Sequence, residues 1–169
     1  MIERQYKDIR PEQILDLSNT DIIPLGTDEI FVKSMDCKDI WLSNYGRVIR
    51  YSNGKYNLLQ GSYDSNGTLL YMLKKNVFFD SKWIYKKDYL FAAKAVVEKF
   101  IVNPDKVNNV YIWHGENDKQ DCYYRNLYPL NQKQYMVVRK HFKKTGDDLE
   151  EFIIKVMNDI RILYKVYEQ

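Results

Sequence analysis

The stretch Val110–Leu127, which reads VYIWHGENDKQDCYYRNL, constrains the fold of this chain more than any other. It opens with a β-prone run that ends at a single histidine, His114. A polar loop with turn-forming residues follows, and the pair Asn126-Leu127 comes twelve residues after the histidine. This order predicts a strand that ends at the histidine, followed by a polar loop and a second short segment.

Length and composition limit the chain to one compact domain or two small ones. Its 169 residues are 45% hydrophobic, which is ample for a core. Fifteen tyrosines favour a surface that stacks or packs on a partner, although a small β-rich core would use them equally well. The two cysteines, Cys37 and Cys122, form no disulfide framework, and no secretory or membrane-spanning run is visible. We therefore expect a cytoplasmic protein that does not act at a membrane.

The net charge of +3 is unevenly distributed along the chain. Residues 30–146 contain twenty basic and ten acidic residues, whereas residues 1–29 and 147–169 carry net charges of −4 and −3. A basic centre between acidic ends suits a surface that faces phosphates. Lysine-rich chains also show such fluctuations by chance, so the charge pattern favours nucleic-acid contact without requiring it.

The first half of the chain is predicted to be mostly β-structure. Residues 1–29 form an irregular N-terminal arm with one short helix near Pro11. Residues 30–75 form a small antiparallel β module, because β-prone runs there alternate with the hairpin signals Asn53-Gly54 and Asn66-Gly67.

The second half is predicted to be more helical, which makes the whole chain α+β. Residues 76–144 begin with a strand pair and contain helices over Tyr89–Ile101 and Gln132–Lys144. Residues 145–169 form an amphipathic helix of about five turns. This helix is acidic, so we expect it to pack on the core or to form an interface through residues 147–169, including self-association, and not to read DNA.

Two runs of sequence resemble parts of phage and intron homing endonucleases of the HNH type. The run IWLSNYGRVIRY, from Ile40 to Tyr51, resembles the small NUMOD-type DNA-binding module that precedes HNH cores. His114 and Asn126-Leu127 fall in the register of the ββα-metal core itself, and the resemblance covers about residues 40–135. It implies that His114 acts as a general base toward a water, while Asn126, on the following helix, keeps the loop and the ring in place.

The same resemblance implies that a twisted antiparallel ribbon enters the major groove of DNA, with arginines near phosphates or base edges. A purely structural interpretation is equally consistent with the turn, since Ser and Asn side chains often cap turns. The candidate DNA-binding residues are Ser43, Asn44, Arg47, Arg50, Lys74 and Lys75.

The positions that hold a divalent metal in the resembled family carry unsuitable residues here. They are the residue before the histidine, Trp113, and the residue nine positions after Asn126, Tyr135. Indole offers no acceptor, and a neutral phenol is a poor ligand for Mg²⁺. We therefore expect no cofactor, with Mg²⁺ bound only if the chain is an active nuclease. The loop carboxylates Glu116, Asp118 and Asp121 offer a shifted site, although a solvated acidic turn explains them more simply.

Three functions follow from these observations. The first is an HNH-like protein that binds double-stranded DNA and has lost most or all cleavage activity. The second is a phage or mobile-element protein that binds and inhibits another macromolecule, acting in the cytoplasm of a bacterial host. The third is an active, metal-dependent nicking endonuclease. The sequence leaves the enzymatic status open.

Overall fold

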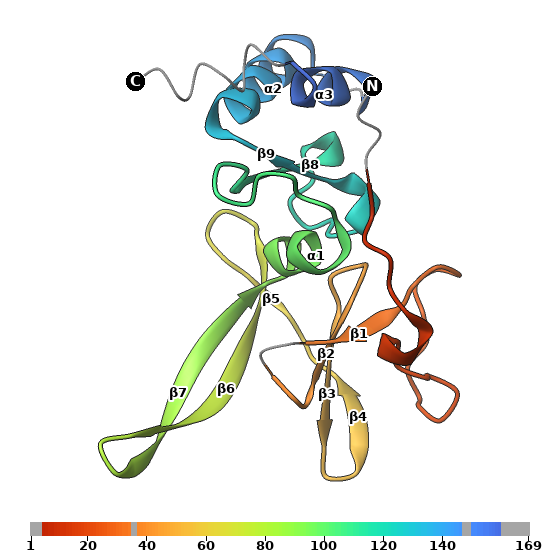
Figure 1. The fold of residues 1–169 in the computed structure, drawn as a ribbon, viewed down its shortest axis with the longest axis vertical. Helices are drawn as coiled ribbons and strands as arrows, with labels where there is room; N and C mark the ends of the chain where they lie inside the picture. The colour runs from red at the N-terminus through yellow and green to blue at the C-terminus, as the bar shows by residue number, and fades with distance from the viewer. Residues whose placement is uncertain (1–4, 35–36, 147–149, 160–169) are drawn as a thin grey trace.

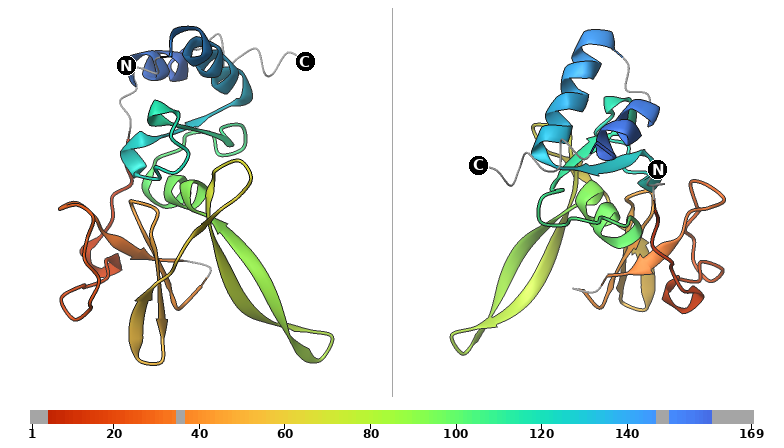
Figure 2. Two further views of the ribbon diagram at one scale, coloured as in Figure 1. Left: turned by 180° about the vertical axis from the view of Figure 1, so that it is seen from behind. Right: turned by 45° about the horizontal axis from the view of Figure 1, so that its top comes forward.

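The computed structural model describes residues 5–34, 37–146 and 150–159, with residues 75–79, 83, 85–86 and 117 described by their backbone alone. Over these ranges the fold is α+β, as predicted, with three antiparallel sheets and three α-helices. Two helices lie at one end of the molecule, and a long hairpin extends from the other end (Figures 1 and 2). In this part of the chain, no helix has the length and apolar character needed to cross a membrane.

The first sheet contains four short strands in the order β1-β2-β3-β4. The predicted turn between β3 and β4 is present, because Asn53 and Gly54 have φ angles of 52° and 75°, as a two-residue type I′ hairpin requires. Apolar side chains of the first three strands are buried, so this sheet forms one wall of the main core. The strands are β1 (Phe31–Lys33), β2 (Ile40–Ser43), β3 (Val48–Ser52) and β4 (Lys55–Leu58).

The second sheet is dominated by a long two-stranded hairpin, which we call the ribbon. It is formed by β6 (Leu69–Phe79) and β7 (Lys82–Phe91), and the short β5 (Ser62–Tyr63) pairs with the start of β6. The outer end of the ribbon projects away from the rest of the molecule in Figures 1 and 2. Asp80 and Ser81 close it, both with positive φ angles.

Helix α1 (Ala92–Phe100) follows the ribbon directly. The predicted helix over Tyr89–Ile101 is wrong at its start, because residues 89–91 continue β7 and pair with residues 70–72 of β6. Cross-strand pairing therefore overrides the helical spacing of the apolar residues in this segment. The buried face of α1 completes the main core.

The main core unites segments that the sequence divides between two predicted domains. The predicted boundary between residues 75 and 76 falls inside β6. Gly46 shows how closely the two segments approach, since a Cβ at this position would lie 2.4 Å from the Cβ of Cys122. The buried members of the main core are Val32, Ile40, Leu42, Val48, Tyr71, Leu73, Ala92, Ala93, Val96, Val97, Phe100, Ile101, Cys122 and Leu127.

The third sheet separates the main core from a second core. It consists of β8 (Tyr111–His114) and β9 (Leu127–Leu130), and helices α2 (Gln132–Thr145) and α3 (Glu150–Met157) follow it. Leu127 faces the main core, whereas the next residue, Tyr128, belongs to the second core, because successive side chains of a strand point to opposite faces. The buried members of the second core are Trp113, Tyr128, Leu130, Val138, Ile153 and Val156.

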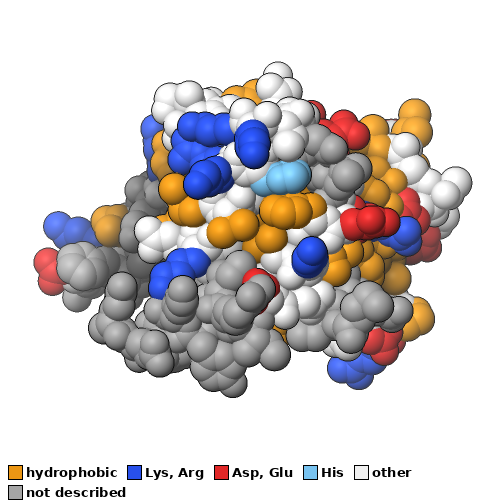
Figure 3. All heavy atoms as spheres, turned by 90° about the horizontal axis from the view of Figure 1, so that it is seen from above, with side chains coloured by type: hydrophobic (Ala, Val, Ile, Leu, Met, Phe, Trp, Pro, Cys, Tyr) orange, Lys and Arg blue, Asp and Glu red, His pale blue; other side chains and the backbone are white. Residues whose placement is uncertain are grey.

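Helix α2 confirms the predicted helix over Gln132–Lys144 to within one residue. Gly146, with a φ angle of 70°, provides the left-handed residue that ends it. On the outer side of α2, Met136 and Val137 are exposed. Figure 3 shows Lys and Arg side chains beside hydrophobic ones at this end of the molecule.

Helix α3 packs against α2 and buries two of its side chains in the second core. It ends at Met157, so the prediction of one helix of about five turns over residues 145–169 is wrong in length. Residues 147–149 and 160–169 of the predicted interface lie outside the described residues. His141 of α2 is half-buried and stacks on Phe152 of α3, with ring centroids 3.9 Å apart.

The N-terminal arm runs along both the first sheet and α1. It contains the single 3-10 turn Pro11–Gln13 (η1) in place of the predicted short helix. Isolated bridges join Tyr6 to Ile101 and Ile14 to Val32, so the arm ties the end of α1 to the edge of the first sheet.

Candidate functional site

His114 lies at the end of β8, where the strand enters the loop. Its side chain is buried, and its Nδ1 lies 2.9 Å from the carbonyl oxygen of Asp121. A carbonyl oxygen can only accept a hydrogen bond, so Nδ1 carries the proton and Nε2 holds the lone pair. Burial lowers the pKa of His114, so the imidazole is neutral at pH 7 and can take up a proton through Nε2.

Asn126 holds the same loop from its other end. It closes the 3-10 turn Tyr124–Asn126 (η3) directly before β9. The predicted position of Asn126 on an α-helix is wrong. The next residue, Leu127, already belongs to β9 and pairs with His114. The predicted tie to the loop is present, since the Asn126 amide donates to Oδ2 of Asp121.

Asp121 connects these two residues. Its carbonyl oxygen accepts from His114, its Oδ2 accepts from Asn126, and its Oδ1 accepts from the backbone N–H of Tyr123 at 2.8 Å. We call His114, Asp121 and Asn126 the polar network. It fixes the imidazole relative to both ends of the loop, and this arrangement could orient a general base.

Trp113, the residue before His114, faces the opposite side of β8. It is buried, and its ring lies 5.7 Å from those of Tyr135 and Phe142 of α2, measured between centroids. Tyr111 reaches Tyr135 from the same side, with a centroid separation of 5.4 Å. We call Tyr111, Trp113, Tyr135 and Phe142 the aromatic cluster.

The two positions assigned to metal ligands by sequence resemblance are therefore neighbours in space. Trp113 and Tyr135 contact each other edge to face, so the positions are brought together, but by rings in place of oxygen or imidazole ligands. An indole and a neutral phenol do not fit a hard divalent cation.

Two of the three loop carboxylates, Asp118 and Asp121, accept hydrogen bonds from within the loop. Oδ1 of Asp118 accepts from the Gln120 N–H at 2.9 Å, as in an Asx turn, and both carboxylate oxygens of Asp121 have partners in the loop. Across the described ranges, no three His, Cys, Asp or Glu side chains gather closely enough to hold a metal ion.

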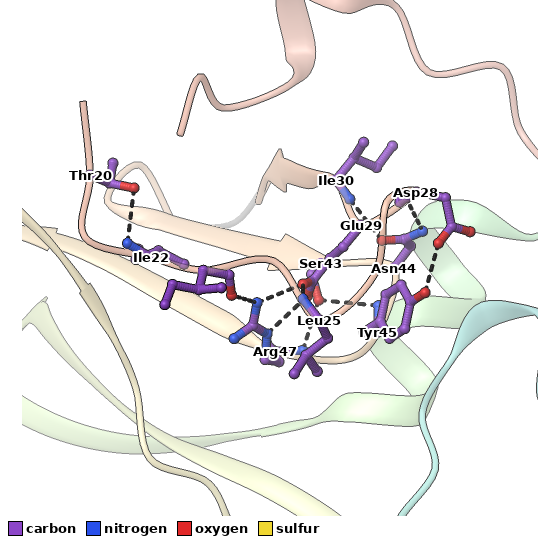
Figure 4. A network of polar contacts seen from close by, with 11 residues as sticks. Thr20, Ile22, Leu25, Asp28, Glu29, Ile30, Ser43, Asn44, Tyr45 and Arg47 are labelled. Atoms are coloured by element: carbon purple, nitrogen blue, oxygen red, sulfur yellow. Dashed lines mark hydrogen bonds and ion pairs between the residues drawn. The ribbon is translucent and has the colours of Figure 1, made fainter. Parts of the chain in front are cut away.

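Ser43 and Asn44, predicted DNA contacts, are buried in the turn after β2 (Figure 4). Ser43 Oγ accepts from the backbone N–H groups of Tyr45 and Arg47, at 3.1 and 3.0 Å. The amide of Asn44 accepts from the Ile30 N–H and donates to the Asp28 carbonyl oxygen. These contacts join the turn to the last residues of the arm.

Arg47 belongs to the same network. One Nη lies 2.6 Å from Oε2 of Glu29, whose side chain is fully buried, and also donates to the carbonyl oxygen of Ile23 (Figure 4). Arg50 is paired with Asp39 at 3.3 Å. Because both charges are compensated within the chain, these arginines have less to offer a phosphate than the sequence pattern suggests.

Lysines occupy matching positions on the two strands of the ribbon. Lys74 is exposed, and the side chain of Lys75 lies outside the described residues. In the ribbon's register, Lys74 stands directly opposite Lys87 and Lys75 opposite Lys86. The ribbon therefore contains two adjacent cross-strand pairs of like charge.

Sequence reasoning overlooked a second basic surface, on α2. This helix contains five basic and no acidic residues. The absence of Asp and Glu between Gln132 and Thr145 is visible in the sequence and could have revealed it. The basic residues are Lys133, Arg139, Lys140, Lys143 and Lys144.

Comparison of the chain with protein-family models, with curated proteins and with solved structures finds no match.

Proposed function

We propose that this chain is a double-stranded-DNA-binding protein on an HNH homing-endonuclease-like scaffold, with cleavage lost or weak. The observation that carries the proposal is the pairing of Lys74 with Lys87 and of Lys75 with Lys86 in the ribbon. Directly opposite residues of an antiparallel pair point to the same face, so Lys74 and Lys87 place two positive charges on one face of the ribbon. A phosphate backbone that lies against this face would meet both charges and release its own counterions.

The shape of the ribbon supports the same proposal. A two-stranded ribbon is narrow enough to enter the major groove of B-DNA, which is about 12 Å wide. The ribbon projects from the body of the molecule, so such an approach does not require the core to open (Figure 1). The basic face of α2 adds a second surface for phosphate contact.

The polar network and the aromatic cluster support descent from a nuclease that no longer cuts well. His114 retains the orientation expected of a general base. In the resembled family the positions of Trp113 and Tyr135 would carry the ligands of a catalytic metal, and here two rings contact each other instead. A base without a Lewis acid forfeits several kcal/mol of transition-state stabilisation, so we propose DNA binding without efficient hydrolysis.

A protein partner is the second candidate, because the ribbon also exposes apolar side chains. Met72, Ile84, Tyr89 and Phe91 are each between 43 and 54% exposed. Binding to a protein would depend on these residues and only weakly on salt, and this difference separates the two proposals.

The test is fluorescence anisotropy with a labelled duplex at salt concentrations from about 50 to 200 mM. Wild-type protein should lose affinity steeply as salt rises. The double variant Lys74→Gln/Lys87→Gln should bind more weakly, with a slope of log K against log salt that is shallower by about 2, if each lysine contacts one phosphate.

Two variants serve as matched controls. Lys55→Gln removes one exposed charge from the β3–β4 hairpin and should leave the slope unchanged. Arg47→Ala should lower thermal stability through loss of its pair with Glu29 and leave the slope of the remaining folded protein unchanged. Salt-independent binding, or the wild-type slope in the ribbon double variant, would rule the proposal out.

A further inference from the structure

A cleft of about 430 Å³ lies between α1, the loop after it and the N-terminal arm. Its volume is within the range of pockets that bind small molecules. The apolar part of its wall comes from Val97 and Ile101 at the end of α1 and from Ile112 of β8. It is formed by residues other than those of the polar network, the aromatic cluster and the ribbon.

Three lysines from separate segments line this cleft. Lys7 comes from the arm, Lys94 from α1 and Lys106 from the loop, against a single carboxylate, Glu98. The ammonium of Lys7 is anchored by a hydrogen bond to the carbonyl oxygen of Glu98. Burial and the nearby charges of Lys106 and Lys99 lower the pKa of Lys7, so positive charge is crowded here.

Asn109 adds a polar group with an unused acceptor to the same wall. Its Nδ2 donates to Oδ1 of Asn103 at 3.1 Å, and Nδ2 of Asn103 donates back to the Asn109 carbonyl oxygen at 3.1 Å. This reciprocal pair fixes the direction of the Asn109 amide. Its Oδ1 is buried and finds no hydrogen-bond partner among the described residues. An unsatisfied buried acceptor is costly, and a donor brought by a ligand would relieve that cost.

We propose that this cleft binds a phosphate-bearing ligand. The phosphate lies among Lys7, Lys94 and Lys106, and the organic part covers Ile101 and Ile112 with a hydrogen-bond donor near Asn109. This chemistry is found in a free mononucleotide and in a phosphate of the DNA backbone with its attached nucleoside. The inference concerns a site separate from the ribbon and does not depend on the ribbon's role.

The experiment is titration of ¹⁵N-labelled full-length protein with adenosine monophosphate, with inorganic pyrophosphate and with a short DNA duplex, followed by amide chemical shifts. Adenosine monophosphate should give saturable shifts at Ile101, Asn109 and Ile112, with a Kd below about 10 mM. Pyrophosphate, which lacks the organic part, should shift the lysine-bearing segments at higher concentration. Shifts in the cleft with the duplex alone would assign the phosphate to the DNA backbone.

The double variant Lys94→Gln/Lys106→Gln should weaken binding of adenosine monophosphate by about tenfold or more, since both side chains are exposed and their loss spares the core. Lys106→Arg keeps the charge and should bind within about threefold of wild type. Lys55→Gln is the charge-matched control and should bind as wild type does. The proposal is overturned if no probe shifts the cleft residues, or if the double variant binds as tightly as wild type. Loss of DNA binding in the ribbon variant, with this titration unchanged, would separate the two sites.

Discussion

The two faces of β8 carry opposite kinds of chemistry one residue apart. His114 is hydrogen-bonded to Asp121, which Asn126 holds in turn, whereas Trp113 faces α2 and packs among the rings of Tyr135 and Phe142 in the second core. Both side chains are buried, so the difference lies in their partners and not in their access to water. The comparison teaches that one short strand can support a hydrogen-bonded polar network on one face and a packed aromatic cluster on the other.

The polar network has a structural role in the connection between β8 and β9. Asp121 caps the turn that leads into η3, and Asn126 satisfies the remaining carboxylate oxygen just before β9 begins. Both contacts shape the connection between the two strands. The form of the loop therefore depends on these contacts and not on the aromatic cluster on the opposite face of β8.

The largest loss of stability is expected from a change in the aromatic cluster. Trp113→Ala should lower the free energy of unfolding by about 3–5 kcal/mol, because it removes a buried indole that contacts both Tyr135 and Phe142. Tyr111→Ala is the control on the same strand and should cost clearly less, since Tyr111 is 38% exposed. Urea denaturation followed by circular dichroism measures both. A loss below about 1 kcal/mol for Trp113→Ala would show that the cluster does not support the fold.

A smaller loss of stability is expected from changes in the polar network. Asn126→Ala should cost about 1–3 kcal/mol, since it leaves Oδ2 of Asp121 without its amide donor. Asn126→Asp, which places a second carboxylate beside Asp121, should cost at least as much at pH 7 and recover at acidic pH. If both variants denature like wild type, the polar network is dispensable for stability and its retention needs another explanation.

The smallest expected effect is on the pH dependence of the free energy of unfolding. Burial lowers the pKa of His114 in the folded protein, so the unfolded chain binds more protons as the pH falls below about 6.5, the usual pKa of histidine. His114 should therefore cost no stability above that pH and reduce stability progressively below it. His114→Gln should flatten this part of the stability curve, measured by urea denaturation from pH 7.5 to 5. An unchanged slope would mean that His114 titrates as it does in the unfolded chain.

Turns and helix ends that depend on neighbouring residues could be predicted from the sequence. Asn53-Gly54 specified its turn through positive φ angles, and α2 followed from its spacing and from Gly146. The start of α1 was missed because strand pairing with β6, which no local pattern encodes, extends β7 to Phe91.

The candidate site was predictable in part. The tie of Asn126 to the loop after His114, and the proximity of Trp113 to Tyr135, were expected from the sequence register, whereas the expected place of Asn126 on a helix was not found. The pairing of Arg47 with Glu29 did not, because the partner is supplied from eighteen residues away by an arm that shows no regular pattern. An arginine that looks available for binding DNA can thus be neutralised by a carboxylate from a segment with no predictable secondary structure.

The most direct test of the separation between the two faces is a plasmid-nicking assay with Mg²⁺ and with Mn²⁺, comparing wild type with His114→Ala. The account predicts that wild type nicks supercoiled plasmid no faster than His114→Ala with either metal, because Trp113 and Tyr135 stand where the proposed scaffold would need metal ligands. The double change Trp113→Asp/Tyr135→Asn would restore ligand chemistry, but it places polar groups in the second core and should first be checked for folding by circular dichroism. Robust nicking by wild type that disappears in His114→Ala would contradict the account, because it would mean that other groups hold the metal and that the site still cuts.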